Sequence, residues 1–253
     1  MHILRTKFGK DIIAEFLPPT RTTKKARVII LCPGMPGSPS KKEVIEFFSR
    51  KGYWVFSPRY KGTWESSGKF LAQSPHLDIK VIIDQLPKGF KDIWSNKIHE
   101  IKPSAIYLFG FSFGGPAAIL NSSNKKVTKI IAFSPVIDWR VEGKDESIDI
   151  LKRFVAQGFG RAFAVAKDGW KKLQSGKFYN PATQLTQIDA SKILIVHAKD
   201  DRIVPYSTSK QFAQKTGAKL ITLERGGHLS SSLAITPRYY KIFQNCIKSG
   251  KVS

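Results

Sequence analysis

The stretch "LFGFSFGG" (residues 108–115) places one serine between two phenylalanines and flanks the group with glycines. It continues an apolar run, "SAIYLFG" (104–110), that is typical of a buried strand, and "GGPAAILNSS" (114–123) after it is typical of a helix. A strand, a glycine-flanked turn and a helix in this order predict an elbow that exposes the serine. The alternative is a Gly-rich turn without a chemical role, since G-x-S-x-G occurs by chance on the order of once in ten such sequences.

Outward from this stretch, short β-rich runs alternate with helical ones. We predict strands at 11–17, 27–32, 53–58, 104–110, 127–135, 192–198 and 219–224, the first as one arm of an antiparallel pair. We predict helices at 41–52, 74–86, 114–123, 205–217 and 235–249. This alternation predicts an α/β fold with a mostly parallel central sheet flanked by helices.

One segment interrupts the alternation. Residues 136–183 separate two core strands by far more than an ordinary connection, and "SIDILKRFVAQ" within them indicates a helix. We expect a core of residues 1–135 and 184–253, with 136–183 as a small helical lid over the carboxyl edge of the sheet, where open α/β sheets bind ligands. Two ordinary surface helices are the alternative.

Composition excludes several classes of protein. The chain has 253 residues, 42% hydrophobic and 24% charged, which suffices for a large core. No apolar run approaches the length of a membrane span, and no secretory signal is visible. The two cysteines, Cys32 and Cys246, stand apart from each other and from any histidine pair, which excludes a zinc knuckle, a redox CxxC site and a disulfide framework. We therefore expect a cytoplasmic protein.

The formal net charge of +23 is the most unusual bulk feature. It predicts non-specific attraction to polyanions or an anionic membrane surface. The basic residues are scattered in pairs, and no nucleic-acid-binding motif is recognisable, so a solvated Lys-rich surface is favoured over a specific nucleic-acid site.

Ser112 is a useful nucleophile only if a base reaches it. Of the five histidines, His228 lies in the glycine loop "ERGGHLSSS" after the last predicted strand, from which an imidazole can reach across the sheet edge. His2 is terminal, and His76 and His99 are expected on or beside helices. His197, inside "ILIVHA", is expected to be a packed core residue.

An acid that orients this base is expected after the preceding strand. There "HAKDDRIVPY" supplies Asp200 and Asp201, and Asp138 is a weaker third candidate. A carboxylate at this place can fix the tautomer of His228 and stabilise its protonated form. A charge that merely caps the following helix is the alternative.

Backbone N–H groups must stabilise the oxyanion. Phe113, directly after Ser112, supplies one. The loop "CPGMPGSP" supplies another, from Gly34, Met35 or Gly37, because its prolines have no N–H to donate.

Together, these motifs make the chain resemble the α/β-hydrolase superfamily over nearly its whole length. The order Ser112, Asp201, His228 matches the family's Ser…Asp…His order, and alignment of "HAKDDRIVP" with the family's "HGxxDxxVP" on Val204-Pro205 selects Asp201. "CPGMPGSP" is similar to the family's "HGxPGS" loop, with proline in place of histidine, which leaves the Met35 N–H as the second oxyanion donor. "SPRYKGTWESSGKF" is similar to its "DxRGxGxSxG" loop, and "SPVIDW" resembles prolyl-oligopeptidase-like catalytic domains.

The resemblance implies a free-standing serine hydrolase that cleaves carboxylic esters through an acyl-enzyme intermediate, without metal or organic cofactor. Ser112, Asp201 and His228 would be catalytic, and Phe111 and Trp139 would contact the acyl group unless they belong to the core. A peptidase or acylaminoacyl hydrolase with the same machinery is the first alternative. A non-catalytic polyanion-binding protein on the same fold is the second. The expected partner is a small ester, or a short acyl or peptide substrate.

Overall fold

The computed structural model describes residues 2–21 and 25–248. Its central sheet has eight strands in the order β1-β2-β4-β3-β7-β8-β9-β10. The strands are β1 (Leu4–Phe8), β2 (Ile12–Leu17), β3 (Ala26–Cys32), β4 (Trp54–Pro58), β7 (Pro103–Phe111), β8 (Val127–Phe133), β9 (Ile193–Ala198) and β10 (Lys219–Leu223). β1 and β2 pair antiparallel, as does β2 with β4, and each further neighbouring pair is parallel. The predicted mostly parallel sheet is confirmed.

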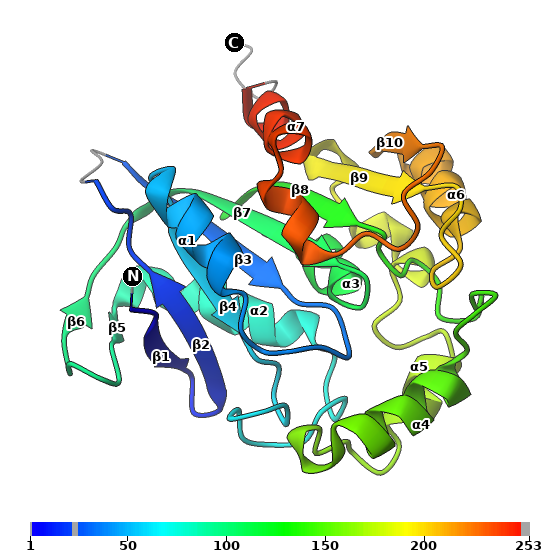
Figure 1. Cartoon of the computed structure of the whole chain (residues 1–253), viewed down its shortest axis with the longest axis horizontal. Coiled ribbons are helices and arrows are strands. Elements are labelled where there is room, and N and C mark those ends of the chain that lie inside the picture. The colour runs from blue at the N-terminus through cyan, green and yellow to red at the C-terminus, as the bar shows by residue number, and fades with distance from the viewer. Residues whose placement is uncertain (1, 22–24, 249–253) are drawn as a thin grey trace.

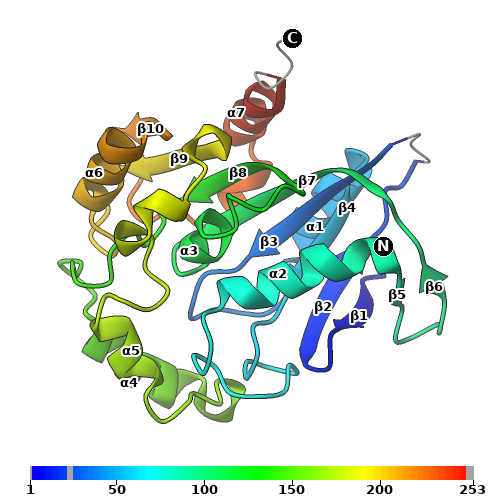
Figure 2. The same ribbon diagram turned by 180° about the vertical axis from the view of Figure 1, so that it is seen from behind.

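Helices cover both faces of this sheet (Figures 1 and 2). The α-helices are α1 (Lys42–Arg50), α2 (His76–Gln85), α3 (Gly114–Ile119), α4 (Ile148–Gly158), α5 (Gly169–Gln174), α6 (Tyr206–Thr216) and α7 (Pro237–Lys248). Single 3₁₀ turns lie at Leu86–Lys88, Gly160–Ala162, Pro181–Thr183, Leu185–Gln187, Ala190–Lys192 and Ser231–Ile235. None of the helices in the described ranges is long and apolar enough to cross a bilayer.

The strand β3 shows how the sequence builds two cores. Successive side chains of a strand point to opposite faces. Val28 and Ile30 accordingly join the apolar cluster that contains α2 and α3, while Ile29 and Leu31 join the one that contains α1 and α7. Because both faces are covered by helices, this central strand is apolar throughout its buried part rather than alternating with polar residues.

The sequence did not reveal a short hairpin between α2 and β7. Strands β5 (Phe90–Lys91) and β6 (Ile98–His99) pair antiparallel there. His99 lies on β6 rather than on or beside a helix, and its ring stacks on Phe90. Two-residue strands are too short to show any periodicity in the sequence. α3 is also shorter than predicted, and residue 249 of the predicted last helix lies outside the described residues.

The segment 136–183 contains α4 and α5, and hydrogen bonds tie it to loops at the carboxyl edge of the sheet. Its residues 162–166 exchange backbone hydrogen bonds with the loop after β4, including Ala164 N–H to Gly62 O at 2.7 Å and Phe70 N–H to Ala164 O at 2.9 Å. It also contacts the loop after β9, because Arg202 binds both carboxylate oxygens of Asp145 at 2.6 Å. The segment therefore lies at the sheet edge at which β4 and β9 end.

Candidate active site

Ser112 occupies a sharp turn between β7 and α3. Its φ of +49° lies in the left-handed region, which a non-glycine residue rarely adopts. Three backbone hydrogen bonds hold this conformation: Ser112 N–H donates to Phe133 O at 3.0 Å, and Ser112 O accepts from Gly115 at 2.9 Å and Val136 at 3.2 Å. The surrounding structure thus maintains the strained residue, an arrangement that is common at functional sites.

The glycines around Ser112 are required by close packing. A Cβ on Gly114 would lie 2.0 Å from the Cys32 carbonyl oxygen, and one on Gly115 would lie 2.3 Å from the Pro135 Cβ. On Gly110 it would lie 2.8 Å from the Gly114 carbonyl oxygen. The elbow can therefore form only because β3, β7 and the start of α3 meet without intervening side chains.

His228 and Asp201 form a hydrogen-bonded pair. His228 Nδ1 lies 2.9 Å from Asp201 Oδ2, and an ionised carboxylate only accepts hydrogen bonds, so Nδ1 donates. Asp201 Oδ1 accepts from the N–H groups of Ile203 and Val204, both at 2.9 Å. Burial alone would raise the pKa of Asp201, but the hydrogen bonds from His197, His228 and the Val204 N–H outweigh it and hold the pKa below its usual range. Asp201 is therefore ionised.

His197 is buried, as predicted for a core histidine, but it also contacts this pair. Its Nε2 lies 3.1 Å from both Asp201 Oδ2 and the Val204 carbonyl oxygen, so Nε2 carries the hydrogen. Its Nδ1, 2.8 Å from Ser209 Oγ on α6, accepts the Ser209 hydroxyl hydrogen. The strand pattern around His197 predicts burial but gives no signal for this contact.

The other two acids considered as partners of His228 have other hydrogen-bond partners. Asp200 accepts from the N–H groups of Gly226 at 3.3 Å and Gly227 at 2.9 Å, which holds the loop that carries His228 and lowers the pKa of Asp200. Asp138 binds Arg140 through Oδ2 at 2.6 Å and Oδ1 at 2.9 Å, and this pairing lowers its pKa. The structure thus brings Asp201, rather than Asp200 or Asp138, to the His228 ring.

Ser134, which the sequence did not single out, links the loop of His228 to the strand beside Ser112. Its Oγ accepts a hydrogen bond from the Leu229 N–H at 3.2 Å, and its own N–H donates to Val196 O at 2.9 Å. It directly follows Phe133, whose carbonyl binds the Ser112 N–H. The Ser134 bond to Leu229 and the Phe133 bond to Ser112 therefore connect the segments of His228 and Ser112. Within the described residues, however, no hydrogen bond joins Ser112 Oγ to His228 directly.

The loop after β3 lies against the elbow. A Cβ on Gly34 would be 3.2 Å from the Phe111 carbonyl oxygen and 3.4 Å from Ser112 Cβ. Met35 follows in the same loop, and Phe113 follows Ser112. In the described part of the chain, neither the Met35 nor the Phe113 N–H donates to a protein acceptor.

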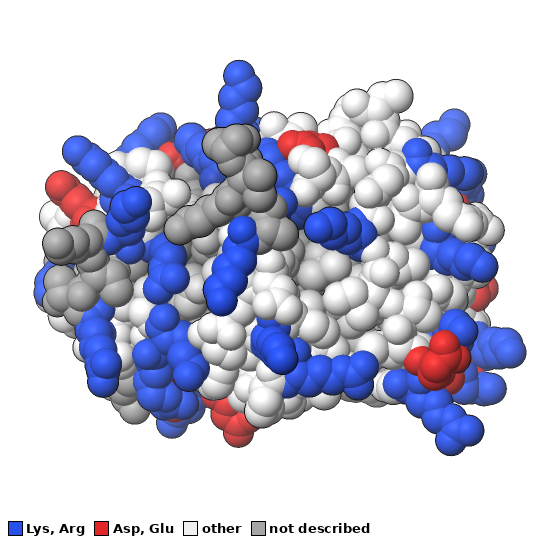
Figure 3. All heavy atoms as spheres, turned by 90° about the horizontal axis from the view of Figure 1, so that it is seen from above, with Lys and Arg blue, Asp and Glu red and all other residues white. Residues whose placement is uncertain are grey.

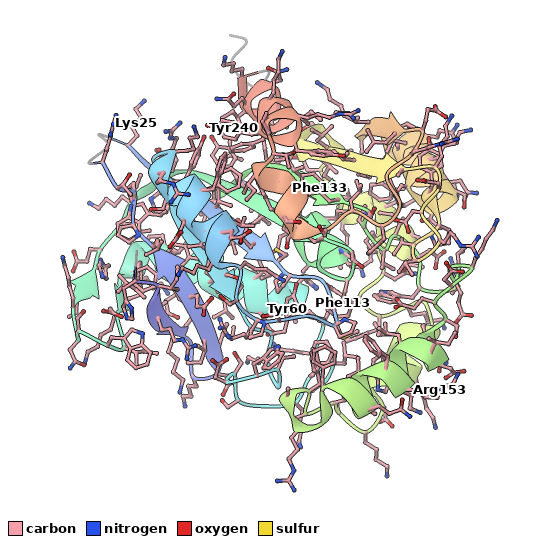
Figure 4. The ribbon with its side chains drawn as sticks, viewed as in Figure 1. Lys25, Tyr60, Phe113, Phe133, Arg153 and Tyr240 are labelled. Atoms are coloured by element: carbon pink, nitrogen blue, oxygen red, sulfur yellow. The ribbon has the colours of Figure 1, made fainter. Side chains whose placement is uncertain are left out.

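The two predicted acyl-contacting residues lie in different places. The Phe111 ring is 3% exposed and stacks on Phe133 in the core cluster that contains α1 and α7. Trp139 packs 5.7 Å from the Phe113 ring, on the opposite face, and lines a small cavity with Val136, Leu151 and Val204. Figure 4 shows Phe113 beside Tyr60 on this side, with ring centroids 5.7 Å apart.

Glu146 is a further acid near the pair. It comes from the 136–183 segment, and burial raises its pKa, while the His228 ring opposes this rise. Among residues 2–21 and 25–248, no three His, Cys, Asp or Glu side chains gather as metal ligands.

Comparison with known proteins places the chain in a family. The model of the prolyl oligopeptidase family matches residues 39–237, well over half of the chain. The chain therefore belongs to the prolyl oligopeptidase family, and it is a serine hydrolase of the esterase and peptidase type. The search of curated proteins found no significant match to this chain.

Solved structures with a similar fold are α/β-hydrolases. A Pyrococcus furiosus esterase matches with a TM-score of 0.66 and 16% identity, covering 98% of this chain and 90% of its own. A serine hydrolase homologue from Coxiella burnetii matches with a TM-score of 0.56 and 15% identity, covering 98% and 96%. A Pyrococcus horikoshii acylaminoacyl peptidase matches with 0.61 and 18%, covering 98% of this chain but 41% of its own. At these identities the likeness shows the fold, and the predicted α/β-hydrolase fold is confirmed.

Proposed function

We propose that this serine hydrolase cleaves carboxylic esters through an acyl-enzyme intermediate, with Ser112 as nucleophile, His228 as base and Asp201 as the orienting acid. The observation that carries the proposal is the hydrogen bond of 2.9 Å between the buried, ionised Asp201 and His228 Nδ1. Ser134 in turn binds the loop that carries His228 and directly follows the residue that binds the Ser112 N–H. The bond to Asp201 places the hydrogen on Nδ1 and leaves Nε2 as the proton acceptor.

The reaction proceeds in two acyl transfers, first to Ser112 and then to water. Ser112 Oγ attacks the ester carbonyl carbon while His228 Nε2 takes the hydroxyl proton. The carbonyl oxygen becomes an oxyanion, which the N–H groups of Phe113 and Met35 stabilise. When the C–O bond to the alcohol breaks, His228 returns the proton to the leaving oxygen. Water then attacks the acyl carbon as His228 takes a proton from it, and His228 passes that proton to Ser112 Oγ as the bond to the acyl group breaks and the carboxylic acid leaves. No step requires a metal or an organic cofactor.

Replacing the nucleophile tests this proposal. Ser112→Ala is expected to lower p-nitrophenyl ester hydrolysis by about 10⁴-fold or more and to abolish fluorophosphonate labelling. The exposed Ser123→Ala is the matched control, since Ser123 lies outside the elbow, and it is expected to retain wild-type rates. Hydrolysis near the wild-type rate by Ser112→Ala would contradict the assignment.

Peptide hydrolysis is the second candidate, favoured by membership of the prolyl oligopeptidase family. The same residues would act, with His228 protonating an amine that leaves far less readily than an alcohol. Ester and blocked peptide chromophores assayed side by side separate the two. Peptide turnover comparable to ester turnover would favour the peptidase.

The segment 136–183 is proposed to act as a lid over the core formed by 1–135 and 184–253. Its position at the carboxyl edge and the cavity that Trp139 lines with Leu151 of α4 support this. Trp139→Ala is expected to lower kcat/KM more for long-chain than for acetyl esters. An equal loss for both esters would assign Trp139 to the core. Phe111 is 3% exposed and packs in the core.

A further inference from the structure

A large basic groove lies at the edge of the sheet opposite the site. It has a volume of about 1050 Å³ and lies at the amino ends of β3, β4, β7 and β8, bounded by α7. Its lining contains five cationic residues: Lys25, Arg27, Lys51, Lys129 and Lys248. Figure 4 places Lys25 and Tyr240 on this side and Phe113 and Tyr60 on the other, and Figure 3 shows Lys and Arg spread over the upper face.

Most of the positive charge of this groove is not neutralised by the protein. None of the lining residues is an Asp or Glu. Within the described ranges, Arg27, Lys51, Lys129 and Lys248 form no ion pair with a carboxylate, whereas Arg59 and Arg202 elsewhere do. Lys51 and Lys248 lie at the carboxyl ends of α1 and α7, where the helix dipole favours a cation.

Arg27 and Lys129 do not lie at helix ends, so the helix dipole does not explain their positions. They lie near the starts of β3 and β8 and are half-buried. The Arg27 guanidinium lies 4.4 Å from the centroid of the Tyr53 ring and donates to the Tyr53 oxygen at 3.4 Å. Burial raises the pKa of Tyr53 to about 12, so its hydroxyl stays protonated beside the Arg27 guanidinium. Lys129 Nζ is held by the Ser191 carbonyl at 3.0 Å. The wall thus presents fixed donors and positive charges.

We propose that this groove binds the phosphate backbone of single-stranded nucleic acid without reading its sequence. Cations spaced along a groove follow a flexible chain of phosphates, and the half-buried Tyr240 at the rim, with Lys51 5.3 Å from its ring centroid, offers a face for a base. A bilayer surface is flat and cannot enter a concave groove, which argues against anionic lipid as the occupant. The overall charge of +23 brings any polyanion to the molecule, and the acid-free groove holds it.

The salt dependence of binding gives the number of phosphates engaged. For single strands the slope of log K against log salt is about −0.7 per phosphate, so five cations predict about −3.5 and a loss of about 100-fold in affinity from about 50 to 200 mM salt. We would follow the anisotropy of a fluorescein-labelled oligothymidylate. Binding requires no ester turnover, so its outcome is independent of the proposed catalysis.

Paired variants locate the site. Arg27→Gln with Lys129→Gln is expected to weaken binding and reduce the slope to about −2. Lys51→Gln with Lys248→Gln, both exposed and outside the core, should do the same, with only a small loss of stability at the two helix ends. Lys152→Gln with Arg153→Gln on α4 removes equal charge far from the groove and should leave the slope unchanged.

Two results would overturn the proposal. One is an equal loss of affinity in the groove and α4 variants, which would mean that net charge alone binds the oligonucleotide. The other is binding to phosphatidylserine-containing vesicles in the absence of binding to the oligonucleotide. Circular dichroism and the Tm of each variant show that it is folded.

Discussion

His197 and His228 donate to the same oxygen of Asp201, at 3.1 and 2.9 Å. The two backbone N–H groups on the other oxygen complete four hydrogen bonds to one carboxylate. Two rings from different segments thus prevent the carboxylate from rotating away from His228. Ser209 in turn fixes which nitrogen of His197 carries the hydrogen. In the proposed mechanism, His197 is therefore a positioning residue, which would act on the reaction through Asp201.

Removal of the His197 donor should lower kcat/KM strongly while the Tm changes little. His197→Leu is expected to lower kcat/KM for p-nitrophenyl esters by about 10- to 100-fold, because small displacements of catalytic groups are costly. His197→Gln keeps an N–H that can reach Asp201 and should recover much of the loss. If both variants lose the same activity at equal Tm, the shared hydrogen bond has no role in positioning.

Ser134→Ala removes the acceptor for the buried Leu229 N–H. An unpaired buried donor costs about 1–3 kcal/mol, so the Tm should fall. Because the same bond holds the loop of His228, the rate of fluorophosphonate labelling of Ser112 should also fall. Ser230→Ala, which removes an exposed hydroxyl from the same loop without touching this bond, is the control. Labelling at the wild-type rate in Ser134→Ala would show that the loop holds His228 without this bond.

Gly114→Ala should prevent the elbow from forming. Its new Cβ would meet the backbone oxygens of Cys32 at 2.0 Å and Pro33 at 2.5 Å, and backbone atoms cannot move aside cheaply. We expect a loss of stability of more than about 3 kcal/mol, measured by urea unfolding. Gly37→Ala, in the adjacent loop, meets nothing within 4 Å and should remain near wild type. A stable, active Gly114→Ala enzyme would be incompatible with this packing.

His76 should make stability depend on pH. Burial lowers its pKa to about 4 from its usual 6.5, while Ser74 Oγ lies 2.7 Å from its Nδ1. Below pH 6.5 the unfolded chain binds a proton at His76 that the folded protein does not. The free energy of unfolding should therefore fall as pH decreases from about 6.5 to 4, by at most about 3 kcal/mol.

The variant His76→Gln isolates this contribution. Its unfolding free energy, measured by urea at several pH values, should depend less steeply on pH across the same interval. Parallel profiles for the variant and the wild type would mean that His76 titrates equally in the folded and unfolded states.

The sequence predicted the fold because its strands and helices carry strong local patterns. The runs around β3, β7, β8 and β9 are apolar and bounded by turn residues, so their places follow from periodicity. The roles of Ser112, Asp201 and His228 stay predictions, but the order of the motifs and the alignment on Val204-Pro205 led to the two residues that the structure joins by a hydrogen bond.

What the sequence did not reveal depends on contacts between distant segments. Ser134 binds Leu229 across 95 residues, and Arg202 binds Asp145 across 57. His197 lay on a strand whose pattern predicts only burial, and its polar contacts arise from the fold of the loop beyond it and from Ser209. Such pairings have no periodic signal, because they are set by which loops the sheet brings together.

The central strands connect the basic groove with the Ser112 elbow. β3 begins beside Arg27 in the groove and leads into Gly34 at the elbow, so the groove and Ser112 lie at opposite ends of one rigid element. A molecule adsorbed through its groove on a phosphate-bearing support would therefore point Ser112, the proposed nucleophile, away from the support. Immobilisation on such a support would orient the enzyme, with every bound copy open to substrate from solution.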